Sequence, residues 1–172
     1  MANLFLSTRR VLLAALALMT PSCGYDLPTE TVEQPGAAPR TSWMNARVEG
    51  DSWNAVFVYA RRENDYLTLE GTAWVSDETT LVIRLTIKAV AGAMPQVIDS
   101  STTIAANVVY DPTYQPWQTW SAFGTMGTGT FTISSLTPTG ATGTFSFSAR
   151  ALTANSVPQD YRVTEGTFDV RF

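Results

Sequence analysis

The sequence contains no histidine, one cysteine, Cys23, and one lysine, Lys88. Without histidine, the chain lacks the commonest general base and metal ligand, and it cannot build a Ser-His-Asp or Cys-His catalytic arrangement. A single cysteine permits neither a disulfide within the chain nor a cysteine-based zinc site. The familiar chemistry that remains uses carboxylates, as in glycoside hydrolysis or calcium binding.

Basic charge is also scarce, with 11 basic residues against 15 acidic ones and a net charge of −4. The arginines are scattered, so no basic surface for nucleic acid is predicted. Many of the carboxylates fall in turns, for example Glu63 with Asp65 and Asp77 with Glu78. Their spacing does not match a calcium-binding loop, and Asp is typical of turns because it bonds the local backbone. We therefore expect no metal and no cofactor.

The N-terminal segment has the parts of an export signal. Arg9 and Arg10 precede an apolar run over residues 11–19, and a small residue stands directly before Cys23. The run is too short to span a bilayer comfortably. A cysteine in this place is typical of a bacterial lipoprotein signal, in which the chain is cut before the cysteine and the thiol is acylated. We predict a signal peptide over residues 1–22 and lipidation of Cys23; plain secretion and an uncleaved anchor are the alternatives.

A flexible tether is predicted between the acylated cysteine and the folded domain. Residues 23–40 carry several prolines and acidic residues with little apolar content, so this segment cannot bury enough surface to order itself. More than one acyl chain anchors a protein stably. In lipoproteins an aspartate after the cysteine signals retention in the inner membrane, and Gly24 stands there instead. We therefore predict that the N-terminal lipid attaches the protein to the outer membrane of a Gram-negative bacterium.

The remainder of the chain, residues 41–172, has the hydrophobic pattern of β-strands throughout. Apolar and polar residues alternate with a period of two, which marks strands with one buried face, and no stretch shows a helical period. The predicted strands cover about residues 43–48, 53–61, 66–75, 79–90, 127–136, 141–152 and 161–172. We predict an all-β fold, either a single antiparallel β-sandwich or a partly open β-barrel of about eight or nine strands.

Glycine marks two further features of this domain. The segment Glu49-Gly-Asp-Ser52 predicts a hairpin turn with glycine in the first position. Gly124, Gly127 and Gly129 precede a strand and not a helix, so they do not form a phosphate-binding loop. They predict a bend or bulge and a close approach between strands.

Four segments of the domain occur in a characteristic order: WMNARVEGDSWNA from Trp43, LTLEGT from Leu67, GATGTFSFSA from Gly140 and YRVTEGTFDVRF from Tyr161. In this order they resemble a family of small lipid-anchored bacterial β proteins of uncharacterised function. The last two motifs are the most specific, and the first departs from the family in its turn residues. The resemblance implies a β fold and a location in the cell envelope, and it brings no catalytic residues.

The richest aromatic cluster lies between Tyr110 and Phe123 and contains two prolines. Exposed aromatic rings on an exported β domain can stack on sugar rings or anchor a protein partner. Tyr114 and Trp117 are the candidate contacts for a glycan or an envelope protein. In the alternative, these two rings pack over the sheet edge, while Tyr110, Trp120 and Phe123 cap the core, since loop aromatics usually cover apolar surface.

Two functions of different class fit the sequence. The first is a non-catalytic binding or interaction module held at the envelope, which accords with the missing His and Cys chemistry, the anchor and the aromatic cluster. The alternative is a carboxylate-dependent enzyme that acts on glycans. That enzyme would need two carboxyl groups about 5–10 Å apart facing one cleft.

Overall fold

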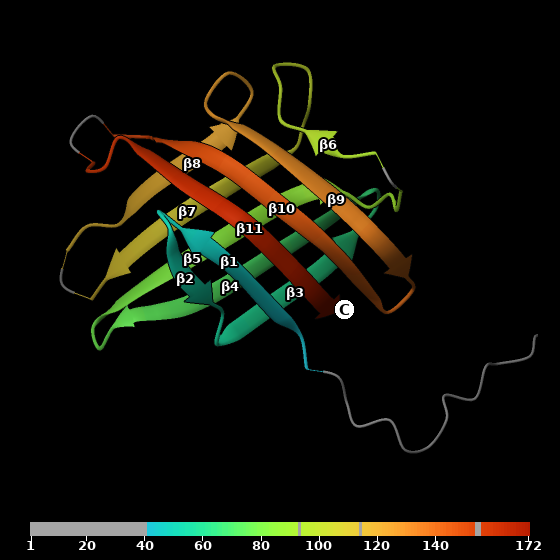
Figure 1. Cartoon of the computed structure of the whole chain (residues 1–172), viewed down its shortest axis with the longest axis horizontal. Helices are drawn as coiled ribbons and strands as arrows, with labels where there is room; N and C mark the ends of the chain where they lie inside the picture. Colours follow the sequence, from blue (N-terminus) through green and yellow to red (C-terminus); the bar gives the residue numbers. More distant parts are fainter. Residues whose placement is uncertain (1–40, 93, 114, 154–155) are drawn as a thin grey trace, which may run out of the picture. The chain divides into compact units, whose positions relative to one another are not determined.

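The computed structural model describes residues 41–92, 94–113, 115–153 and 156–172. Cys23, the predicted signal peptide and tether, and Tyr114 lie outside the described residues. The described residues form strands, turns and loops but no helix (Figure 1). The strands are β1 (Trp43–Val48), β2 (Asp51–Asn54), β3 (Phe57–Glu63), β4 (Tyr66–Ser76), β5 (Thr79–Lys88), β6 (Gln96–Val97), β7 (Ala105–Pro112), β8 (Gln118–Phe123), β9 (Thr128–Thr137), β10 (Gly140–Ala151) and β11 (Asp160–Arg171).

These strands form one antiparallel sheet that curls into a half-barrel (Figure 1). Hydrogen-bonded neighbours follow the order β2-β1-β11-β10-β8-β7-β5-β4-β3, while β9 pairs with β10 and β6 pairs with β9 outside this path. The predicted all-β antiparallel fold is confirmed, and of the two predicted architectures the partly open barrel is the one observed.

The two ends of this order, β2 and β3, follow each other directly in the chain. The Ala55 N–H donates to the Met44 carbonyl of β1 at 2.9 Å, and the Val56 N–H donates to the Thr72 carbonyl of β4 at 2.8 Å. The chain therefore crosses from one edge of the sheet to the other within two residues. The prediction of one continuous strand over residues 53–61 is wrong, because the backbone changes its partner between Ala55 and Val56.

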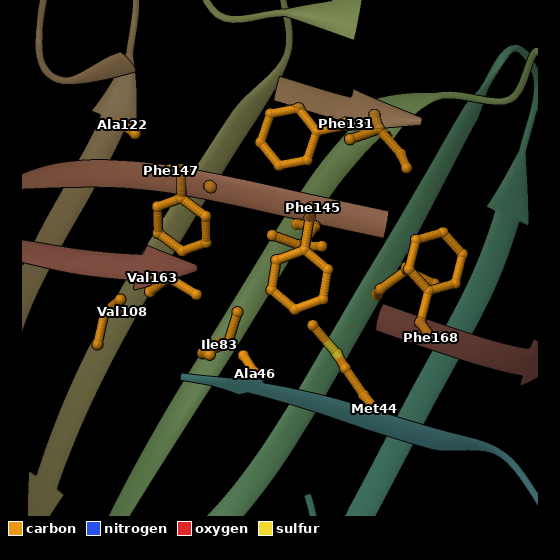
Figure 2. Close-up of a cluster of buried hydrophobic side chains, with 14 of the residues drawn as sticks. Met44, Ala46, Ile83, Val108, Ala122, Phe131, Phe145, Phe147, Val163 and Phe168 are labelled. Atoms are coloured by element: carbon orange, nitrogen blue, oxygen red, sulfur yellow. The ribbon is translucent and has the colours of Figure 1, made fainter. Parts of the chain in front are cut away.

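Alternation along the strands fills the inside of the half-barrel with apolar side chains. The buried positions of β5, β9 and β10 alternate as the period of two predicts, and those of β11 do so from Gly166 onward. At the centre, aromatic rings from β9, β10 and β11 meet aliphatic side chains from β1, β5, β7, β8 and β11 (Figure 2). The labelled members of this cluster are Met44, Ala46, Ile83, Val108, Ala122, Phe131, Phe145, Phe147, Val163 and Phe168.

Glycines make room for large rings inside the half-barrel. A Cβ atom on Gly166 would lie 2.5 Å from the ring of Phe145, and one on Gly71 would lie 2.6 Å from the ring of Trp53. No side chain fits at such distances, so each glycine lets a ring pack against bare backbone. Gly127 has a positive φ of 80°, and a Cβ there would meet a carbonyl of β10. The predicted close approach of strands at Gly127 is thus confirmed.

Candidate binding site

One end of the half-barrel brings together the β1–β2 turn, the β4–β5 turn, the β7–β8 connection and the β10–β11 connection, seen at the left of Figure 1. These connections share one end because neighbouring strands run in opposite directions. We call this end of the domain the mouth.

A pocket of about 210 Å³ opens at the mouth, and we call it the mouth pocket. It is lined by Val48, Glu49, Asp51, Ser52, Trp53, Val75, Leu81, Tyr110 and Tyr161. Val48, Trp53 and Leu81 are buried and form an apolar floor, while Tyr110 and Tyr161 are half-buried. The pocket is therefore apolar and aromatic in its depth and polar only at its rim.

A larger hollow of about 490 Å³ lies beside β3, between Tyr59 and the C-terminal Phe172. Most of its lining is exposed, including Tyr59, Arg61, Arg62 and Asn64. Ligand sites bury most of the surface of a small ligand. None of the described residues that line this hollow is buried, so it could not enclose a ligand in this way. The mouth pocket is for this reason the better candidate site despite its smaller volume.

Buried contacts hold the aromatic walls of the mouth pocket in place. The rings of Trp120 and Tyr161 meet edge to face, with centroids 4.4 Å apart and planes at 67°. The Trp120 Nε1–H donates to the Pro158 carbonyl at 2.7 Å, which ties the β10–β11 connection to β8. On the floor, the Trp53 Nε1–H donates to the Leu81 carbonyl at 3.2 Å. The indole donors of both tryptophans are thus satisfied within the protein.

The β1–β2 turn supplies the acidic part of the rim. Glu49 and Gly50 are its two central residues, with φ angles of 53° and 93°. Positive φ at both positions is typical of a type I′ hairpin turn, so the predicted glycine-first turn is wrong. Contacts to β11 hold Glu49 in this conformation: its N–H donates to the Arg162 carbonyl at 2.9 Å, and its carboxylate accepts the Arg162 N–H.

The rim carboxylates have no ion-pair partner within the part of the chain that the structure describes. Five ion pairs occur there, and their acidic members are Glu63, Glu70, Asp160, Glu165 and Asp169. Neither Glu49 nor Asp51 is among them. Burial, followed by the Glu49 carboxylate and Tyr110, raises the pKa of Tyr161 above its ordinary value of 10.0. The negative charge of Glu49 therefore disfavours ionisation of the Tyr161 phenol.

The β7–β8 connection carries the predicted contact Trp117 at the same end of the domain. Trp117 is 73 % exposed, which the contact hypothesis requires and which edge packing does not explain. The Thr113 N–H and hydroxyl both donate to the Glu78 carbonyl, at 2.9 and 2.7 Å, and so fasten this connection to the β4–β5 turn. The second predicted contact, Tyr114, lies outside the described residues.

The other aromatic residues of the cluster divide between the core and the surface. Trp120 is buried, as the core-capping alternative predicts, and Tyr110 is half-buried at the mouth. Phe123 is 47 % exposed and does not cap the core. It ends β8, where the chain turns to form β9, and its backbone pairs with Met126.

Sequence reasoning missed Tyr161, Glu49 and Asp51 as site residues. Tyr161 is the first inward-facing residue of β11, two positions before the buried Val163. Glu49 and Asp51 flank a glycine in a short turn. An aromatic residue at the first inward position of a strand is the one available signal. It indicates a ring at the end of a barrel but not which other rings stand beside it.

No family model, curated protein or solved structure matches the chain. Within the described ranges, no helix is long and apolar enough to cross a membrane. Among the same residues, no three His, Cys, Asp or Glu side chains gather in a way that could hold a metal ion. The fold and the site define a curled antiparallel β domain with a filled centre and an aromatic, acid-rimmed pocket at one end.

Proposed function

We propose that the protein is a non-catalytic binding module held at the outer membrane by a lipid on Cys23, and that its mouth is the contact surface. The mouth itself carries the proposal, since exposed Trp117 and a pocket with an apolar floor lie at the same end of the domain. Ligands often bind in the mouths of β-barrels, and exposed aromatic rings are frequent anchors of binding.

The partner in this proposal is a glycan or an envelope protein. The exposed indole of Trp117 suits either, because it can stack on a sugar ring or fill a hollow on a protein surface. A tether over residues 23–40 would let the domain reach a partner away from the membrane. Both features point to contact with other components of the envelope.

The lipid anchor is tested separately from binding. A Cys23→Ala variant should lose acyl labelling and move from the membrane fraction to the soluble fraction. A variant that stayed in the membrane fraction would place the anchor elsewhere in the chain.

Binding is tested by applying the full chain to an array of glycans and envelope proteins. Trp117→Ala should lower retention by about tenfold or more, as the loss of an exposed aromatic anchor does. The matched control is Trp43→Ala, because Trp43 is also exposed, at 42 %, but lies at the start of β1, away from the mouth. Equal retention of wild type and Trp117→Ala would contradict the proposal.

One observation favours the glycan-acting enzyme as a second candidate: two carboxylates, Glu49 and Asp51, line the same pocket. Glycoside hydrolysis uses such a pair. The carboxylate of Glu49, however, already accepts the backbone N–H of Arg162 and helps to hold the turn. Release of reducing ends from envelope glycans, abolished by Asp51→Asn, would establish the enzyme and overturn the non-catalytic proposal.

A further inference from the structure

The lining of the mouth pocket selects a ligand by charge. Among the residues that the structure describes, no lysine or arginine lines it, whereas Glu49 and Asp51 both do. The neighbouring Arg47 is occupied, since its guanidinium pairs with Glu165 at 3.1 Å and donates to the Gly50 carbonyl at 2.8 Å. An anion would meet two carboxylates and no compensating cation here, so the lining favours a cation.

The inner lining of the mouth pocket favours a cation that has no N–H donors. Its floor consists of Val48, Trp53 and Leu81, and the Trp53 indole N–H already bonds the Leu81 carbonyl. A primary ammonium pushed against this floor would leave N–H donors without partners, which costs free energy. A quaternary ammonium has no N–H donor, and its methyl groups can lie against apolar and aromatic side chains.

Aromatic side chains strengthen this preference. Tyr110, Tyr161 and Trp53 all line the mouth pocket, and quaternary ammonium ions are the ligands that aromatic pockets recognise through cation–π attraction. Burial and, after it, the charge of Glu49 raise the pKa of Tyr161, and Glu49 lines the same pocket. Aromatic rings and carboxylates therefore act on one small volume.

The size of the pocket fits a headgroup rather than a whole macromolecular segment. An apolar cavity of about 150 Å³ can hold a benzene molecule, and the mouth pocket measures about 210 Å³. That space suits a trimethylammonium group with a short chain, and the exposed rim leaves the remainder of a larger ligand outside.

We propose that the mouth pocket binds a quaternary ammonium group, the cation carried by free choline and by phosphocholine headgroups. This proposal rests on the proposed function, because it names the chemical group that the pocket at the same mouth would take. Glu49 and Asp51 supply the opposing charge at the rim, and Tyr110, Tyr161 and Trp53 supply the surface against which the methyl groups pack.

The test is calorimetric titration of the full chain with choline at low ionic strength. The matched ligand is the neutral carbon isostere of choline, in which a tert-butyl group replaces the trimethylammonium group. Choline should bind at least about tenfold more tightly, since only choline gains from the carboxylates and from cation–π attraction. Equal affinities, or no binding of choline, would overturn the proposal.

Three variants test whether choline binds in the mouth pocket. Asp51→Asn and Glu49→Gln should each weaken choline binding about two- to fivefold, as expected for partly exposed charges. Glutamine at position 49 keeps an oxygen that can accept the Arg162 N–H. Asp77→Asn is the matched control, because it removes one charge from the β4–β5 turn without altering the lining of the pocket. Choline affinity that falls equally in all three variants would reduce the effect to net charge and contradict the site.

Two sources of the cation, a lipid headgroup and a free solute, are distinguished by flotation of the Cys23→Ala variant, which lacks the predicted lipid site, with phosphatidylcholine vesicles. Binding to vesicles as well as to choline assigns the headgroup, and binding to choline alone assigns the free solute; both results support the pocket. Failure of this proposal can also be distinguished from failure of the proposed function. If choline does not bind but Trp117→Ala still loses array retention, only the ligand class is wrong. If Trp117→Ala keeps full retention, the proposed function itself fails.

Discussion

The centre and the mouth of the half-barrel are built by the same alternation of side chains but are packed differently. At the centre, Phe145 and Phe168 are buried and lie against glycines of neighbouring strands. At the mouth, Tyr110 and Tyr161 are half-buried and border a pocket of about 210 Å³. A ring at the centre has neighbours on all sides, whereas a ring at a strand end lacks neighbours beyond the turn. The centre therefore carries the packing that stabilises the fold, and the mouth is where we propose that binding occurs.

The largest effect is expected from removing a central ring. Phe145→Ala or Phe168→Ala should lower the free energy of unfolding by about 3–5 kcal/mol, because the surrounding strands cannot collapse into the space. Urea denaturation measures this difference. Trp117→Ala is the contrasting variant, and its unfolding free energy should stay within about 0.5 kcal/mol of wild type. Comparable losses at both positions would abolish the distinction between centre and mouth.

The next effect tests whether the glycines are required at the centre. A Cβ on Gly143 would lie 2.5 Å from the Phe168 ring and would also meet the Thr132 carbonyl. Gly143→Ala should therefore lower the unfolding free energy by about 1–3 kcal/mol through overpacking. Gly92→Ala serves as control, since no described residue lies within 4 Å of a Cβ placed there. A neutral Gly143→Ala would show that the centre has unfilled space.

A smaller effect is expected where the two regions meet, at Trp120. Trp120→Phe keeps an aromatic ring under Tyr161 but removes the donor to the Pro158 carbonyl. Stability should fall by about 1–2 kcal/mol, as for loss of one partly buried hydrogen bond. Choline affinity should fall with it, because the wall formed by Tyr161 loses support. Unchanged affinity in a destabilised variant would show that the mouth does not depend on this contact.

The smallest effect concerns ionisation of Tyr161. Its pKa is raised in the folded state, so the unfolded chain ionises first as the pH rises. The stability that neutral Tyr161 contributes is complete below about pH 10 and is lost as the pH climbs through the higher folded value. Denaturation at a series of alkaline pH values should show a steeper decline for wild type than for Tyr161→Phe. Parallel curves would remove the evidence that burial and Glu49 act on this phenol.

Much of the centre could be predicted from the sequence, because its signal is local. The alternation in β5, β9 and β10, and in β11 from Gly166 onward, depends only on residues two positions apart, and the buried faces follow it. The change of partner at Ala55 and Val56 could not be predicted, since it depends on β1 and β4 lying on opposite sides of the chain there. β6 and β7 give only a weak local signal. β6 has just two residues, and small and polar residues weaken the hydrophobic alternation of β7.

The mouth could be predicted only in part. Trp117 stands out in the sequence because prolines and aromatics surround it. The pocket does not, because β1, β2, β4, β5, β7 and β11 each contribute to its lining or to the turns beside it. Val48 and Tyr161 meet there although more than half of the chain separates them. Their proximity follows from the pairing of β1 with β11, which no spacing of residues encodes.

The most direct measurement is a map of backbone amide shifts in the NMR spectrum of the full chain as choline is added. Shifts should concentrate at the mouth, around Glu49, Asp51, Leu81, Tyr110 and Tyr161, while amides of the central residues around Phe145 stay in place. Shifts centred on the hollow between Tyr59 and Phe172, or spread evenly over the sheet, would contradict the assignment of binding to the mouth.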